Sequence, residues 1–128
     1  MNKLFMFLFF FATVLGFSVQ SHAALQNRGT DINGNRLIYD SDFNITWYDY
    51  THSTADWNSQ MGWASALTVN FGGIIYDDWR LPTALNQTGT GPCNGYNCTG
   101  SEMGHLYYTE LGNIAGGGLS NKGDFQHL

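Results

Sequence analysis

The chain has 128 residues and a formal net charge of −5 at pH 7. An acidic chain without a basic stripe repels phosphate backbones, which excludes nucleic acid as an expected partner. The length allows one domain at most, and many aromatic residues and glycines beside few charges are typical of an extracytoplasmic domain rich in loops and short strands.

The N-terminal segment, residues 1–23, has the three zones of a cleavable secretory signal peptide. Lys3 supplies a positive charge, and residues 4–17 form an almost unbroken apolar run. This run is shorter than the ~20 residues that span a bilayer. The sequence therefore predicts cleavage between Ala23 and Ala24, and a secreted, periplasmic or cell-surface protein. No stable membrane span is expected in the remaining chain.

The first structural elements expected after the leader are two short strands. Residues 24–36 are polar and predict a linker or N-terminal loop. Residues 36–40 and 45–48 are rich in β-branched and aromatic residues, and a turn separates them at residues 41–44. The pattern predicts a β-hairpin.

Polar residues before and within this hairpin resemble the spacing of a calcium-binding EF-hand loop. Asp31, Asn33 and Asn35 alternate, and Asp42 follows eleven residues after Asp31. However, Arg36 occupies the position where such a loop needs glycine, and the last ligand is Asp rather than Glu. A simple turn explains the same residues and is the favoured interpretation.

Two later segments have the spacing of amphipathic helices. The first begins after a polar break at residues 51–54, and its apolar positions are Trp57, Met61, Ala64 and Leu67. The second begins with Ser101 as N-cap and Glu102 in its first turn, and ends near Gly112. The glycine-rich tail over residues 116–128 shows little periodicity and few apolar residues.

The two cysteines, Cys93 and Cys98, lie in a polar segment between the helices. In an exported protein, such a close pair predicts a local disulfide, which contributes roughly 2 kcal/mol in the chain-entropy model. The alternative is half of a zinc site, but no second cysteine pair supplies the other ligands. The histidines at positions 52, 105 and 127 have no partner at i+2 or i+4, so no metal site, no cofactor and no catalytic residues are predicted.

The most specific string in the chain lies between the helices and reads Trp79-Arg80-Leu81-Pro82-Thr83. An arginine with such apolar neighbours is expected to be buried, and a buried guanidinium needs a carboxylate or carbonyl partner. The predicted partner is Glu102 at the start of the second helix. Accordingly, Arg80→Ala is expected to be far more damaging than Lys122→Ala.

At this string the chain resembles a known family. The segments that carry the resemblance are, in chain order, residues 37–40, 44–47, 63–64, 77–83, 101–103 and 111–113. Together they resemble the Lcl C-terminal-like domains of unknown function, which occur in exported bacterial proteins that often bear a PEP-CTERM sorting signal. The step from Arg80 to Thr83, followed by a Glu-bearing helix, is also similar to the sulfatase-modifying-factor group. This resemblance implies an α+β, C-type-lectin-like architecture over residues 37–128, with two helices and short antiparallel strands.

The chain departs from these families in two ways. Their closing strands have no counterpart after residue 113, so we expect an incomplete domain that is molten or prone to aggregation. The catalytic cysteines of the sulfatase-modifying enzymes also have no counterpart. The resemblance therefore implies a non-enzymatic binding or adhesion module with a carbohydrate or protein partner at the cell surface. The alternatives are a non-functional gene fragment and an enzyme of the formylglycine-generating type, which would need clusters of Cys or His.

Overall fold

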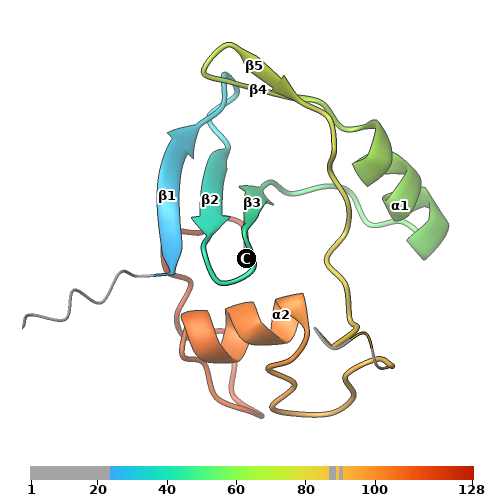
Figure 1. The fold of residues 1–128 in the computed structure, drawn as a ribbon, viewed down its shortest axis with the longest axis vertical. Helices are drawn as coiled ribbons and strands as arrows, with labels where there is room; N and C mark the ends of the chain where they lie inside the picture. Colours follow the sequence, from blue (N-terminus) through green and yellow to red (C-terminus); the bar gives the residue numbers. More distant parts are fainter. Residues whose placement is uncertain (1–23, 87–88, 90) are drawn as a thin grey trace, which may run out of the picture.

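A computed structural model describes residues 24–86, 89 and 91–128, so the predicted signal peptide at residues 1–23 lies outside the described part. The described chain is a small α+β fold with two separate antiparallel sheets and two helical segments (Figure 1). Within it, no helix has the length and apolar character needed to cross a bilayer.

The larger sheet has three strands in the order β1-β2-β3. They are β1 (Leu25–Thr30), β2 (Arg36–Asp40) and β3 (Ile45–Asp49). Strands β2 and β3 confirm the predicted hairpin, in which Leu37 pairs with Tyr48. The prediction of a linker or loop over residues 24–36 is wrong, because β1 pairs with β2 along its length. Its polar side chains give no hydrophobic alternation, yet the main-chain hydrogen bonds of an edge strand do not require one. The expectation of an incomplete domain assumed that the β2–β3 hairpin had no further strand. Strand β1 adds a third strand to it.

Side chains of the larger sheet alternate between two faces. One face contributes to a buried cluster that consists of Ile38, Leu106, Leu111 and Phe125. On the opposite face, Leu37, Tyr39 and Tyr48 line a groove. The sheet therefore separates the hydrophobic core from the groove.

The C-terminal tail completes this core. Phe125 is only 7% exposed, although the sequence indicates little for the tail to bury. The carboxylate of Asp49, at the end of β3, accepts hydrogen bonds from the backbone N–H groups of Gln126 at 2.6 Å and His127 at 2.9 Å. Figure 1 shows the C-terminus beside β3. A buried carboxylate thus fixes a segment that has no regular structure of its own.

Helix α1 (Trp57–Ala66) confirms the first predicted helix. Its N-cap is Asp56, whose side chain accepts a hydrogen bond from the backbone N–H of Ser59. Of the expected apolar face, only Ala64 is buried, and Trp57 is 64% exposed. The helix therefore lies against the rest of the molecule through Ala64 and the half-buried Trp63, and leaves Trp57 and Met61 on the surface.

The second helix starts as predicted but changes its geometry. The Ser101 side chain caps α2 (Glu102–Gly104) by accepting from the backbone N–H of Gly104 at 3.1 Å. The helix then continues as the π-helical segment η1 (His105–Glu110), drawn in Figure 1 as part of the same coil. Its backbone hydrogen bonds span five residues instead of four, which changes the side chains that share a face.

A small hairpin joins the two helical segments. Strands β4 (Val69–Phe71) and β5 (Ile74–Tyr76) pair with each other, and Gly72 and Gly73 between them have φ of 60° and 84°. Positive φ at both central residues is the geometry of a tight hairpin turn, which glycine adopts without strain. An extended segment then leads from β5 toward α2 (Figure 1).

Candidate functional site

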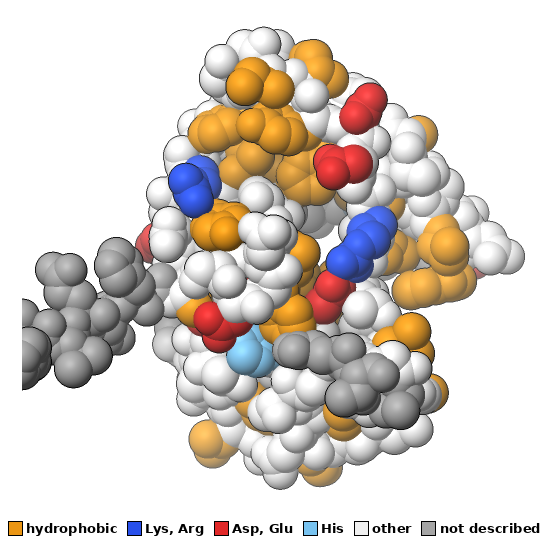
Figure 2. Space-filling model, viewed as in Figure 1, with side chains coloured by type: hydrophobic (Ala, Val, Ile, Leu, Met, Phe, Trp, Pro, Cys, Tyr) orange, Lys and Arg blue, Asp and Glu red, His pale blue; other side chains and the backbone are white. Residues whose placement is uncertain are grey.

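The face of the larger sheet opposite the core opens into a groove of about 700 Å³. Strands β2 and β3, helix α1 and the extended segment after β5 all contribute to its walls. We call it the aromatic groove, after its lining side chains Tyr39, Tyr48, Tyr50, Trp63, Phe71, Tyr76 and Trp79. Figure 2 shows hydrophobic side chains gathered below the β4–β5 hairpin, beside a hollow in the surface.

Aromatic rings form a continuous row in this groove. The ring centroids of Trp79 and Tyr48 are 5.4 Å apart, those of Tyr48 and Tyr50 5.6 Å, and those of Tyr50 and Trp63 5.9 Å. The ring of His52 stacks on that of Trp63, with centroids 4.2 Å apart. Tyr48 and Tyr50 share a face because they are two residues apart in extended chain. The row therefore gathers four large aromatic side chains, with the hydroxyl groups of Tyr48 and Tyr50 at its edges.

Charged and amide groups surround these rings. The guanidinium of Arg28 lies over the ring of Tyr39, 4.5 Å from its centroid. Asn44, Asp78 and Arg80 also line the groove. Apolar faces combined with a few hydrogen-bonding groups are the usual composition of a small-molecule binding site.

An ion pair between Arg80 and Glu102 forms part of the lining of the groove.

 Arg80 donates to both carboxylate oxygens of Glu102, at 2.8 Å and 2.5 Å, and also to the backbone carbonyl of Leu81 at 3.1 Å. The same carboxylate accepts the backbone N–H of Thr83 at 2.8 Å. Glu102 therefore ties the extended segment, which carries Trp79, to the start of α2.

This geometry confirms the predicted partner of Arg80 but not its predicted burial. The Arg80 side chain is 57% exposed, whereas that of Glu102 is 9% exposed. The difference arises because Arg80 lies on an extended segment at the surface, while Glu102 is fixed in the first turn of α2. Hydrogen bonding from Arg80 lowers the pKa of Glu102, against the opposing effect of its burial.

The polar loop that resembles a calcium site is a turn. One carboxylate oxygen of Asp31 accepts the backbone N–H groups of Asn33 and Asn35, each at 2.9 Å. The other accepts the hydroxyl of Tyr48 at 2.7 Å. These contacts confirm the interpretation of residues 31–35 as a turn, here between β1 and β2. They also hold one ring of the aromatic row in place.

The Tyr48 hydroxyl should ionise at a higher pH than an ordinary tyrosine. Burial, followed by its hydrogen bond to Asp31, raises the pKa of Tyr48 to about 12. Since the folded pKa is raised, its contribution to stability is present below about pH 10 and is lost as the pH rises toward 12. Titration followed by tyrosinate absorbance should show one late step that Tyr48→Phe removes. A wild-type titration with every tyrosine near pH 10 would contradict this assignment.

The predicted cysteine pair is at disulfide distance. The Cα atoms of Cys93 and Cys98 are 5.5 Å apart, within the range that a disulfide requires. The pair closes a short loop before Ser101, the cap of α2. It is therefore placed to shape the approach to that helix.

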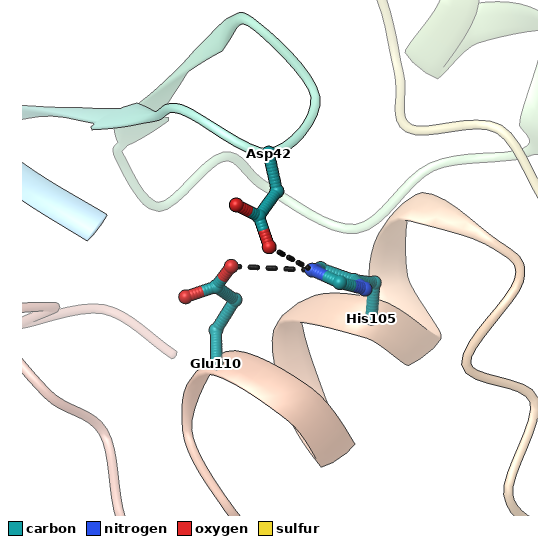
Figure 3. A group of neighbouring side chains, drawn as sticks. All are labelled: Asp42, His105 and Glu110. Carbon is teal, nitrogen blue, oxygen red and sulfur yellow. Dashed lines mark hydrogen bonds and ion pairs between the residues drawn. The ribbon is translucent and has the colours of Figure 1, made fainter. Parts of the chain in front are cut away.

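A second cluster of functional groups lies where the β2–β3 turn meets the π-helix (Figure 3). The Nε2 atom of His105 is 3.1 Å from a carboxylate oxygen of Asp42 and 3.2 Å from one of Glu110. The sequence has no partner for His105 at i+2 or i+4, and its partners in the structure lie instead five residues further on and on another element. Glu110 follows His105 by five residues, a spacing that shares a face in a π-helix but not in the α-helix that the sequence indicates.

Negative charge is concentrated around this imidazole. Burial, and then the nearby charges of Asp40 and Asp42, raise the pKa of Glu110. The Asp40 carboxylate accepts the backbone N–H groups of Asp42 and Phe43 at 3.0 Å and 3.3 Å, which fixes the turn that carries Asp42. The ring of Phe43 meets that of His105 edge to face, with centroids 4.7 Å apart. The cluster is thus held from both the sheet and the helix.

Comparison of the chain with models of protein families, with curated proteins and with solved structures found no match.

Proposed function

We propose that the protein is an exported, non-enzymatic binding module with a C-type-lectin-like architecture, and that the aromatic groove binds a neutral carbohydrate. The observation that supports this most is the row of rings from Trp79 to Trp63, with ring centroids 5.4 to 5.9 Å apart. The faces of such rings carry partial negative charge and attract the polarised C–H groups of a sugar ring.

The polar groups of the groove suit the hydroxyl groups of the same ligand. Arg28 and Arg80 can donate hydrogen bonds, and Asn44 and Asp78 can accept them. Opposite charges are thus present around the groove, in a chain whose net charge is −5. This balance favours a neutral saccharide over a strongly anionic polymer.

Tyr50→Ala should weaken saccharide binding about tenfold, because it removes one ring from the middle of the row. Tyr50 is 44% exposed, so its truncation should leave the fold intact. Binding of cellohexaose, xylohexaose and chitohexaose is measured by titration calorimetry. Tyr50→Phe should retain most of the affinity, since it keeps the ring and removes only the hydroxyl.

Tyr96→Ala is the matched control, because Tyr96 is 74% exposed and does not line the groove. It should bind each saccharide as the wild type does. Equal binding by the Tyr50→Ala and Tyr96→Ala variants would place the saccharide elsewhere. Failure of all three saccharides, together with binding of a peptide that Tyr50→Ala abolishes, would show a protein partner instead.

A further inference from the structure

The cluster of Asp42, His105 and Glu110 has the composition of a metal site. Imidazole nitrogen and carboxylate oxygen together are ligands that zinc and other divalent transition metals accept. The two carboxylates come from different elements, the β2–β3 turn and the end of η1, and both point toward the same nitrogen of His105 (Figure 3). The chemistry of the cluster therefore favours a cation between the sheet and the helix.

The distances within the cluster suit one ion. Ligand atoms at about 2.1 Å from a common zinc ion are separated by roughly 3.0 to 3.5 Å. The separations of 3.1 Å and 3.2 Å from the His105 nitrogen to the two carboxylates lie in this range. All three ligand atoms lie within 4.8 Å of one another, so the two carboxylates need only a small approach.

Burial gives the cluster a closed side and an open side. The side chains of Glu110 and His105 are 6% and 14% exposed, whereas that of Asp42 is 48% exposed. An ion can therefore enter past Asp42, and that carboxylate can turn toward Glu110. The buried carboxylate of Asp40 adds negative charge near the cluster. It is not one of the three ligand groups, because it accepts the backbone N–H groups of Asp42 and Phe43 in the turn.

We infer that Asp42, His105 and Glu110 form a binding site for one divalent transition-metal ion, which fastens the β2–β3 turn to the π-helix. The ion takes the place of the hydrogen-bonding proton between the imidazole and the carboxylates. Solvent can supply the remaining ligand at the open side. This site lies apart from the aromatic groove, because none of its three residues lines that groove.

Zinc binding to the metal-free protein, measured by titration calorimetry with zinc chloride, tests this inference. The wild type should bind one zinc ion and should melt at a higher temperature when zinc is present, because a ligand of the folded state stabilises it. Magnesium and calcium should bind more weakly, since they prefer sites made only of oxygen ligands. Absence of zinc binding would show that the cluster is an ion pair only, and would overturn the inference.

Asp42→Asn should weaken zinc binding by at least about tenfold, because it replaces an anionic ligand with a neutral one. Asp42 is exposed, so this variant keeps the fold, which near-UV circular dichroism checks. Asp77→Asn is the matched control, with the same change of charge at an exposed position outside the cluster. Equal zinc affinity in the two variants would locate the ion elsewhere and overturn the inference.

Discussion

Arg80→Ala should lower the free energy of unfolding by about 2 kcal/mol at neutral pH. The change leaves the buried carboxylate of Glu102 without its cation and keeps only the hydrogen bond from Thr83. The loss is smaller than for a fully buried pair because Arg80 is 57% exposed, so water enters the space that it leaves. Urea denaturation measures the difference, and Lys122→Ala is the control at an exposed position.

The pH dependence of this loss identifies its cause. The folded pKa of Glu102 lies below its ordinary value of 4.5, so the ion pair contributes fully above that pH and is lost as the pH falls through the lower, folded value. The stability difference between wild type and Arg80→Ala should therefore shrink in acid. A second change, Glu102→Gln, should recover part of the loss by removing the unpaired charge. A difference that stays constant from neutral pH to pH 3 would contradict the assigned role of the pair.

Ile38→Ala should have a larger effect, a loss of about 2 to 5 kcal/mol. Ile38 has no exposed surface and lies in the cluster with Leu106 and Phe125, so truncation leaves a cavity under the sheet. Native domains are stable by only about 5 to 15 kcal/mol, so this variant should be partly unfolded on mild heating. Urea and thermal denaturation measure the loss.

Ile32→Ala provides the matched control for the core. Its side chain is 80% exposed, so the same truncation should change the stability by less than about 0.5 kcal/mol. The comparison also tests the expectation of a molten chain. A molten chain would show no cooperative transition and no difference between the two isoleucine variants, whereas a packed core predicts a sharp transition that only Ile38→Ala weakens.

The two proposed sites have different relations to the fold. The aromatic groove lies on the face of the sheet that points away from the core, so changes to Tyr50 should affect binding and leave the stability almost unchanged. The metal cluster connects the turn of Asp42 with η1, so its occupation should alter both zinc affinity and thermal stability. The two experiments can therefore succeed or fail independently.

Local signals in the sequence determined the elements that depend on neighbouring residues. The β2–β3 hairpin follows from a run of β-branched and aromatic residues around a turn, and both helices begin near the residues expected to cap or precede them. The ion pair of Arg80 with Glu102 was also predictable, because a cation among apolar neighbours needs an anion and the next helix begins with one.

Tertiary structure decided the features that depend on residues far apart in the chain. Strand β1 forms because β2 offers a free edge, and Phe125 is buried because Asp49 fixes the backbone that follows it. The exposure of Arg80 was set in the same way, by the path of the extended segment over the surface.

The candidate metal cluster also depends on residues that local sequence patterns do not bring together. Helical spacing predicts neighbours at three or four residues, but the π-helix turns Glu110, five residues on, toward His105, and the fold brings Asp42 to the same point from another element. Composition and periodicity record only the local preferences of a chain. The position of a side chain from a distant segment is fixed by the packing of the whole domain, and that packing leaves no periodic trace in the sequence.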